Sequence, residues 1–324
     1  MTSNRLPMTT TRRDALRALS ALSITTIATA GCGATPSHRS SGFFAEHDTP
    51  IGVQLYTVGE LARDDLDATF AKLQAIGFRS VELAGLHGST PVRLHEAALR
   101  HGLQLTGIHL QATGANGDPG LDAAPGQIAA TLLQMGITEA TLPLMPLPFG
   151  PDKDESFLAY LVRAGSQLGE DDWKRAADFL NAHAGALRKE GIRLGYHNHN
   201  FEFRPLGSTT GWDVLLAHTD PALVDFELDA GWAAAAGLDP TEVLLAHPGR
   251  FRQIHVKDIR PTAANFALHQ EPTEVGRGIL AWRRILPAAW KAGVRRFYVE
   301  QEPPFNGDRF DSLSASFNYL SERV

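Results

Sequence analysis

The feature that most constrains the fold is an eightfold alternation of short apolar runs with segments of helical periodicity, which begins at Pro50. A parallel strand buried on both faces reads as a short apolar run, and the helix that follows it shows apolar residues every three or four positions. Eight such units predict an α/β protein with one domain, a (β/α)8 TIM barrel at residues 50–324. No glycine-rich phosphate fingerprint follows any strand, which argues against a doubly wound open sheet. The expected strands are 51–56, 79–84, 103–110, 138–144, 192–196, 223–228, 251–256 and 295–299. The expected helices are 61–76, 92–100, 128–135, 156–164, 171–189, 212–217, 241–246, 281–292 and 312–320.

The residues ahead of the barrel have the composition of an export signal. Arg12-Arg13 precede a weakly apolar segment that ends in small residues, the pattern of a twin-arginine signal peptide. We expect this signal at residues 1–32, a flexible tether at residues 33–49, and an exported, periplasmic protein; a disordered basic leader is the alternative. The only cysteine, Cys32, stands where a lipoprotein signal is cleaved. A lipid anchor at Cys32 would be the one membrane contact. The alternative is cleavage after Ala28-Thr29-Ala30 without an anchor, because Thr29 stands where a lipoprotein signal usually has a larger aliphatic residue.

The overall charge argues against nucleic acid as a partner. The chain carries a formal net charge of -6 and has a sequence pI of about 6.1, so it lacks the basic footprint of a nucleic-acid-binding protein. A small molecule is the expected partner, and the sequence leaves the oligomeric state open.

Polar side chains follow four successive strands of the expected barrel. The fifth strand runs directly into Tyr196-His-Asn-His-Asn-Phe-Glu-Phe203, and the next three strands end at Asp229, His255 and Glu300. Active sites of TIM barrels lie where the strands end. Each residue alone could merely cap its strand, but four successive ends with ligand-type side chains indicate one site. This mixture of oxygen and nitrogen ligands suits Mn²⁺, Co²⁺, Zn²⁺ or Mg²⁺.

Other polar residues are expected at the same rim. Glu82 and His109 end the second and third strands, and Tyr56 lies on the first. Lys257 follows His255, and a fixed positive charge there can stabilise an enolate oxygen. For Glu82, polar packing in the barrel interior is the alternative.

Six short motifs occur in the same order and at the same barrel positions as in a known family. The chain resembles the sugar phosphate isomerase/epimerase family, of the xylose-isomerase-like TIM barrel type, from about Ile51 to Glu302. The motifs are Ile51–Thr57, Ser80–Leu83, Tyr196–Phe203, Leu228–Trp232, Ile254–Asp258 and Tyr298–Glu302.

The resemblance implies one divalent metal ion. In that family the ligands are Glu, Asp, His and Glu at the ends of strands five to eight, which implies Asp229, His255 and Glu300 here. His197 stands in place of the first glutamate and is the expected fourth ligand, with His199 and Glu202 as alternatives. Mn²⁺ is the expected ion, and Co²⁺, Zn²⁺ and Mg²⁺ are the alternatives.

The resemblance also implies residues that contact the substrate. Trp232 stands where relatives with several metals have a histidine, which implies a single metal here, and its ring can form an apolar wall for a sugar. The expected substrate-binding residues are Tyr56, Glu82, His109, His199, Glu202, Trp232 and Lys257.

The implied activity is that of a metal-dependent sugar isomerase or epimerase. Glu300 would remove a proton next to a carbonyl, Lys257 would stabilise the enolate, and His197 would replace the second catalytic glutamate. The first alternative is a lyase or dehydratase, or a hydrolase-like enzyme, acting on keto-sugars, 3-keto-glycosides or keto-inositols. The second alternative is a non-catalytic periplasmic barrel that binds a sugar or polyol.

Overall fold

The computed structural model describes residues 42–324. The expected export signal, Cys32 and most of the expected tether lie outside the described residues, so they stay predictions. Among the described helices, none is long and apolar enough to cross a membrane.

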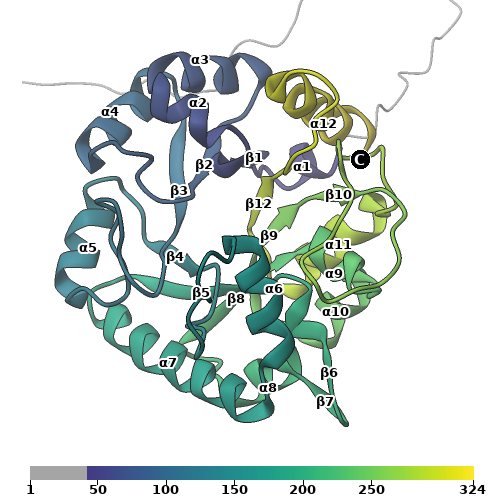
Figure 1. The fold of residues 1–324 in the computed structure, drawn as a ribbon. Helices are drawn as coiled ribbons and strands as arrows, with labels where there is room; N and C mark the ends of the chain where they lie inside the picture. Colours follow the sequence, from purple (N-terminus) through teal and green to yellow (C-terminus); the bar gives the residue numbers. More distant parts are fainter. Residues whose placement is uncertain (1–41) are drawn as a thin grey trace, which may run out of the picture. The chain divides into compact units, whose positions relative to one another are not determined.

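Eight parallel strands form a closed barrel at the centre of the molecule (Figure 1). Each strand pairs with the next barrel strand along the chain, and β12 closes the ring against β1. The expected α/β barrel is therefore confirmed. The strands are β1 (Gly52–Gln54), β2 (Ser80–Leu83), β3 (Gln104–His109), β4 (Glu139–Leu142), β5 (Arg193–His197), β8 (Val224–Asp229), β9 (Phe251–Val256) and β12 (Arg296–Val299).

Helices surround the barrel (Figure 1). Local signals set several helix ends: Thr90 caps the helix that begins at Pro91, and Glu170 and Asp171 lie in the first turn of the longest helix, where acidic residues favour the helix dipole. The helices that connect barrel strands are α3 (Leu66–Ile76), α4 (Pro91–Arg100), α5 (Pro125–Leu133), α7 (Glu170–Lys189), α8 (Gly211–His218), α10 (Pro240–Ala246) and α11 (Trp282–Ala292), and α12 (Arg309–Arg323) follows β12.

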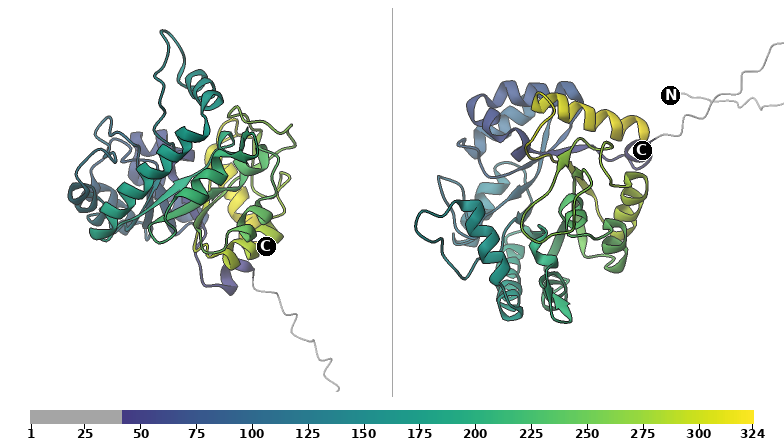
Figure 2. Two further views of the ribbon diagram at one scale, coloured as in Figure 1. Left: turned by 90° about the horizontal axis from the view of Figure 1, so that it is seen from below. Right: turned by 45° about the vertical axis from the view of Figure 1, so that its right-hand side comes forward.

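Further short elements decorate the barrel loops. Helix α6 and the loop before it stand out from the barrel (Figure 2), and α9 follows the last residue of β8 directly. These elements are α2 (Gly59–Asp64), α6 (Phe157–Gln167), α9 (Ala230–Ala235), the ribbon β6 (Pro205–Leu206) with β7 (Thr209–Thr210), and the ribbon β10 (Asp258–Ile259) with β11 (Pro272–Thr273).

Two local predictions were wrong. The expected strand 51–56 ends at Gln54, because the Gln54 side chain accepts the Tyr56 N–H and caps a 3-10 helix at Leu55–Val58. Tyr56 therefore lies beyond the strand and is 56% exposed. The expected single helix 61–76 is interrupted at Asp65, whose extended backbone allows its side chain to cap α3.

The end of the expected tether packs on the barrel instead. Helix α1 (Phe43–Glu46) buries Phe43 and Phe44, whose rings lie 5.4 and 5.6 Å from the ring of Phe297 on β12. The Phe43 N–H also donates to the carbonyl of Val324, at the other end of the chain. The isolated sequence Phe-Phe after a polar stretch gave no sign of these distant partners.

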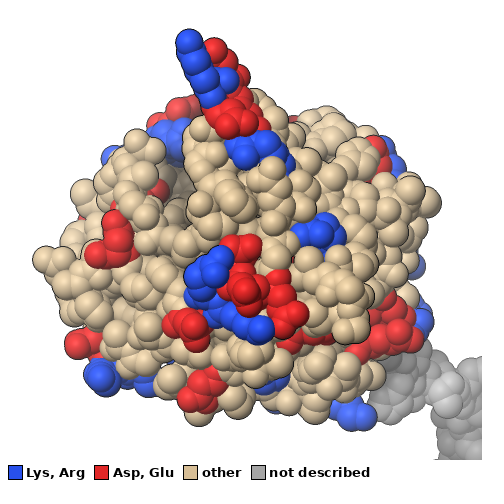
Figure 3. All heavy atoms as spheres, turned by 60° about the horizontal axis from the view of Figure 1, so that its bottom comes forward, with Lys and Arg blue, Asp and Glu red and all other residues tan. Residues whose placement is uncertain are grey.

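Charged residues on the outer surface are mixed in sign. On the face drawn in Figure 3, lysine and arginine lie among aspartate and glutamate, with no large area of one sign. The charges that could do chemistry are those that point into the barrel.

We predict that the contact made by α1 stabilises the barrel. Phe43→Ala should lower the free energy of unfolding by about 3 kcal/mol, because it removes a buried ring and leaves a gap. Urea denaturation of the full chain measures this. The matched control is Phe157→Ala, which removes a ring that is 71% exposed and should change stability by less than about 0.5 kcal/mol. Equal effects of the two changes would contradict the assignment.

Candidate functional site

The side chains of the site come from alternate residues of the barrel strands. Along β8, the side chains of Asp225, Glu227 and Asp229 point into the barrel, because successive strand residues face opposite sides. Phe226 packs outward against the Trp212 ring at 5.0 Å. The barrel interior is thus polar in several layers, and the uppermost layer lies at the carboxyl ends of the strands.

Three expected metal ligands come together. Asp229, His255 and Glu300 are buried, and each offers a ligand atom within 4.8 Å of the other two. His255 Nδ1 lies 3.1 Å from Glu300 Oε2 and 3.7 Å from Asp229 Oδ2. We call these residues the Asp229 group.

A second group lies directly beside it and consists of His109, His197, Glu227 and His255. Glu227 Oε2 lies 2.9 Å from His109 Nε2, 3.0 Å from His197 Nδ1 and 3.3 Å from His255 Nε2. We call it the Glu227 group. Glu227 was not among the predicted site residues, because it lies two residues before the end of its strand. The period of two along β8 was a usable signal, since the residue two before an inward Asp229 also points inward.

His197 links the two groups. Its Nδ1 faces Glu227, and its Nε2 lies 3.8 Å from Asp229 Oδ2. Its ring centre is 4.6 Å from that of His255. Position 197 is therefore where a fourth ligand beside Asp229 would stand.

The two alternative fourth ligands belong to neither group. Glu202 is buried, and its oxygens accept hydrogen bonds from the Tyr196 hydroxyl at 2.8 Å and the His199 N–H at 2.9 Å. The His199 side chain is 24% exposed and lies against the rings of His197 and Trp232, at 5.1 and 5.6 Å.

Lys257 supplies the only ammonium group at this rim among the described residues. Its Nζ lies 2.6 Å from Glu300 Oε2, 2.7 Å from Glu302 Oε1 and 2.9 Å from Asp229 Oδ2. The stem passes so close to Gly231 that a Cβ there would lie 2.7 Å from Lys257 Cγ. Glycine at 231 therefore lets the lysine reach the carboxylates.

Glu82 and His109 belong to the buried network rather than to an open surface. Glu82 Oε2 accepts from Gln54 Nε2 and lies 2.8 Å from His255 Nε2. The His109 side chain is only 10% exposed and bridges Glu82 and Glu227.

Two of the expected substrate contacts, Trp232 and Tyr56, differ in how far they are exposed. Trp232 lies in α9 and is buried, with Lys257 Nζ 5.2 Å from its ring centre. Its ring therefore packs against site residues and offers no open wall to a sugar. Tyr56 is exposed over about half of its surface. Partial burial and the nearby carboxylates of Glu302 and Glu300 raise the pKa of its hydroxyl, so Tyr56 lies beside the rim.

Charge compensation sets the protonation of the cluster. Burial favours a protonated Glu300, but Lys257 and His255 outweigh it and hold the pKa of Glu300 well below its usual range. Burial favours a neutral His255, but Glu227 and Glu300 outweigh it and raise the His255 pKa well above the usual range. For Glu82, burial and the negative charge of Glu227 outweigh the effect of His109 and His255, and they raise its pKa to about 7.

The donor set fits a metal ion. Glu82 Oε1 and Glu227 Oε1 are buried oxygens without a hydrogen-bond partner, and buried polar atoms are usually paired. Carboxylates and imidazoles together suit a borderline divalent ion. This buried His/Glu/Asp cluster can therefore bind a metal ion, and its residues leave the identity of the ion open.

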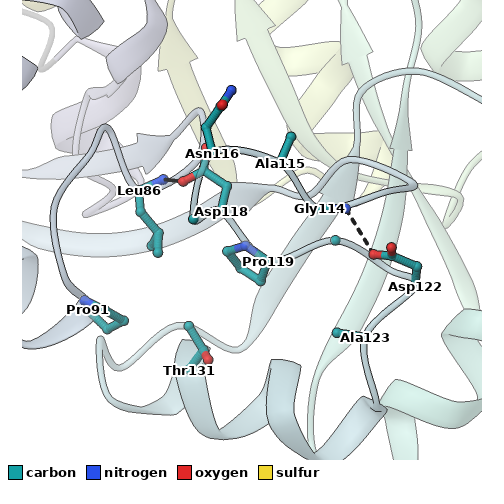
Figure 4. A pocket seen from close by; sticks show the side chains of 12 residues that line it. Leu86, Pro91, Gly114, Ala115, Asn116, Asp118, Pro119, Asp122, Ala123 and Thr131 are labelled. Carbon is teal, nitrogen blue, oxygen red and sulfur yellow. Dashed lines mark hydrogen bonds between the residues drawn. The ribbon is translucent and has the colours of Figure 1, made fainter.

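A hollow elsewhere on the molecule does not share these features. Its volume is about 590 Å³, and Leu86, Asn116 and Thr131 are among the residues that line it (Figure 4). Its two carboxylates are engaged locally, Asp118 with the Leu86 N–H and Asp122 with the Gly114 N–H. The two groups that could hold a metal ion therefore share no residue with this hollow.

We predict that Glu202 makes stability depend on pH. Burial raises its pKa to about 7, above the ordinary value near 4.3, so the folded protein binds the extra proton in this window. Stability should fall as pH rises from about 4.5 to 7 and stay level above, by an amount of roughly 3 kcal/mol. Glu202→Gln should reduce this slope in urea denaturation curves but not abolish it, because the pKa of Glu82 is also raised to about 7. An unchanged slope would contradict the assignment.

Comparison with known proteins agrees with this architecture. An inosose dehydratase of Bacillus anthracis is 33% identical over 170 residues, which cover 48% of this chain and 56% of that protein. The chain thus matches about half the length of this curated relative. The crystal structure of a sugar phosphate isomerase/epimerase from Parabacteroides distasonis superposes with a TM-score of 0.66 at 22% identity, covering 84% of this chain and 93% of that one. A xylose isomerase-like TIM barrel protein from Mycobacterium smegmatis, crystallised in complex with magnesium, gives a TM-score of 0.59 at 14% identity, over 85% and 96% of the two chains.

The family assignment rests on a match that covers most of the chain. Residues 70–309 match the family described as xylose isomerase-like TIM barrel, and this range contains every residue of the Asp229 and Glu227 groups. The resemblance seen in the sequence motifs is therefore confirmed. The chain belongs to the family of xylose isomerase-like TIM barrels.

Proposed function

We propose that the protein is a divalent-metal-dependent enzyme that removes a proton next to a carbonyl of a sugar-like substrate. The observation that carries this proposal is the Asp229 group with the Lys257 ammonium against two of its carboxylates. Proton abstraction beside a carbonyl needs a base and a positive charge close together. A barrel that only binds sugars needs neither arrangement.

The Asp229 group and His197 would hold the metal. A bound divalent ion would supply Lewis-acid polarisation of the substrate carbonyl. His197 Nε2 and His255 Nδ1 both lie within 4 Å of Asp229 Oδ2, so two imidazoles and two carboxylates would face the ion. We expect Mn²⁺, Co²⁺ or Zn²⁺ to bind more tightly than Mg²⁺, because imidazole suits those ions better.

Glu300 is the proposed base. Its contacts with His255 and Lys257 both use Oε2, which leaves Oε1 to accept the proton. The Lys257 ammonium beside it keeps the carboxylate ionised and lies where negative charge would develop on the substrate.

The lyase or dehydratase outcome is the better supported one. The curated relative is an inosose dehydratase, which favours a keto-inositol or another cyclic ketone as the substrate. A two-base epimerase needs a second base on the opposite face of the substrate, and the expected glutamate position holds His197. The isomerase or epimerase is the second candidate, and it would require His197 to act as that base instead of binding the metal.

We predict that Glu300→Gln slows proton abstraction by about 10²–10⁴-fold. The assay follows exchange of the substrate C–H in heavy water, with inososes, keto-sugars and 3-keto-glycosides as probes. Loss of a hydroxyl or glycosyl group indicates the lyase, and a stereoisomer or an aldose–ketose pair indicates the second candidate. Exchange at the wild-type rate by a metal-loaded Glu300→Gln protein would remove Glu300 from the role of base. Binding of these probes without exchange would instead indicate the non-catalytic barrel.

We also predict that Asp229→Ala loses the metal, since Asp229 lies between both histidines of the proposed site. Elemental analysis after reconstitution with Mn²⁺, Co²⁺ or Zn²⁺ should find about one ion per wild-type chain and almost none in the variant. Circular dichroism should show that the barrel is intact. A wild-type protein without metal after reconstitution would refute metal dependence.

A further inference from the structure

We propose that Glu227, a residue outside the expected ligand set, is a positioning residue for the metal site. Together with Glu82 it holds an N–H on His197 Nδ1 and on His255 Nε2, so that the nitrogen which each ring turns toward Asp229 is the one left to bind a metal ion. The inference rests on the proposed metal-dependent function and adds the residues that prepare its ligands.

The two nitrogens of His197 face different surroundings. A neutral imidazole has one N–H donor and one lone pair. His197 Nδ1 lies 3.0 Å from Glu227 Oε2, within hydrogen-bond range, and a carboxylate can only accept. The N–H therefore sits on Nδ1, and the lone pair of Nε2 faces Asp229 Oδ2 at 3.8 Å.

His255 is arranged like His197, but here Nε2 faces the outer carboxylates and Nδ1 faces Asp229. Its Nε2 lies 2.8 Å from Glu82 Oε2 and 3.3 Å from Glu227 Oε2. Its Nδ1 faces the carboxylates of Asp229 and Glu300, which already have the Lys257 ammonium beside them. In the metal-free protein Nδ1 also lies within hydrogen-bond range of Glu300 Oε2, so it carries a proton too, and a metal ion would displace that proton. The carboxylates of Glu82 and Glu227 have only imidazoles as positive partners, so the N–H on Nε2 is kept.

Glu227 lies where it can accept a hydrogen bond from more than one imidazole ring. It is fully buried in the middle of β8, and its Oε2 faces three imidazoles at once. A buried carboxylate costs free energy unless it is paired, and its pairing here orients rings whose other nitrogens meet at Asp229. Metal-binding histidines commonly donate their second N–H to a carboxylate, which fixes ring and tautomer.

The test is metal affinity in solution, with Zn²⁺ as the probe. Apo-protein is titrated in competition with a chelator for the wild type, Glu227→Gln and Asp229→Asn. Removing an outer carboxylate of this kind typically weakens metal binding by about 10–100-fold, so Glu227→Gln should fall in that range while Asp229→Asn loses far more. The matched control is Glu274→Gln, because Glu274 is also a buried carboxylate but bonds to Asn306, Ser312 and Thr273; its affinity should be unchanged.

A second readout separates positioning from general structural damage. Ring ¹⁵N resonances of the zinc-loaded protein should show His197 metallated at Nε2 and His255 at Nδ1. In the metal-free protein, His197 should show the single Nδ1–H tautomer in the wild type and a mixture of both tautomers in Glu227→Gln. If Glu227→Gln does not fold, Glu227→Asp keeps the charge but withdraws it from the rings, and it should weaken Zn²⁺ binding in the same direction.

Three results would overturn the inference. Unchanged affinity and tautomer in the Glu227 variants would remove Glu227 from this role and leave the proposed function standing. A loss as complete as that of Asp229→Asn would make Glu227 a direct ligand instead. A wild-type protein that binds no Zn²⁺ would refute the proposed metal dependence as well. Failure of the Glu227 role alone is therefore distinguishable from failure of the proposed function.

Discussion

The structure depends on compensation of charge inside a closed barrel. Glu82, Glu227, Asp229 and Glu300 are buried at the carboxyl ends of the strands, and an isolated ionised carboxylate in such a place would be strongly disfavoured. The groups that pair with these carboxylates are the ammonium of Lys257 and the imidazoles of His109, His197 and His255. These charges persist only because each is paired, and the fixed strand positions determine the pairs.

The barrel geometry turns this constraint into a site. Strands pair side by side around the ring, so inward side chains from β2, β3, β5, β8, β9 and β12 meet toward the carboxyl end of the barrel. Lys257 reaches two carboxylates because Gly231 leaves room for its stem. Some of the buried carboxylate oxygens still have no hydrogen-bond partner. The cluster can therefore accept a divalent cation.

The sequence was sufficient for the barrel and for much of its rim, because both follow from short-range periodicity. Apolar runs located all eight strands, and the residues that end them included Asp229, His255 and Glu300. Residues whose role depends on a distant partner were harder to find. Glu227 looks like one acid in an apolar strand until the three imidazoles from other strands are seen around it. Phe43 and Phe44 look like part of a tether until the Phe297 ring is seen beneath them.

The choice of ligand at strand five could not come from sequence at all. His197, His199 and Glu202 lie within six residues, and only their surroundings separate them. Both Glu202 oxygens are held by Tyr196 and the His199 backbone, whereas His197 lies between Glu227 and Asp229.

The most direct test of this account is a crystal structure of the zinc-loaded protein with anomalous diffraction at the zinc edge. We predict one strong peak at the rim, about 2.0–2.2 Å from His197 Nε2, Asp229 Oδ2, His255 Nδ1 and a Glu300 oxygen, with Glu227 still bonded to His197 Nδ1. A peak among His109, Glu227 and His255 Nε2, or no peak at the rim, would contradict it.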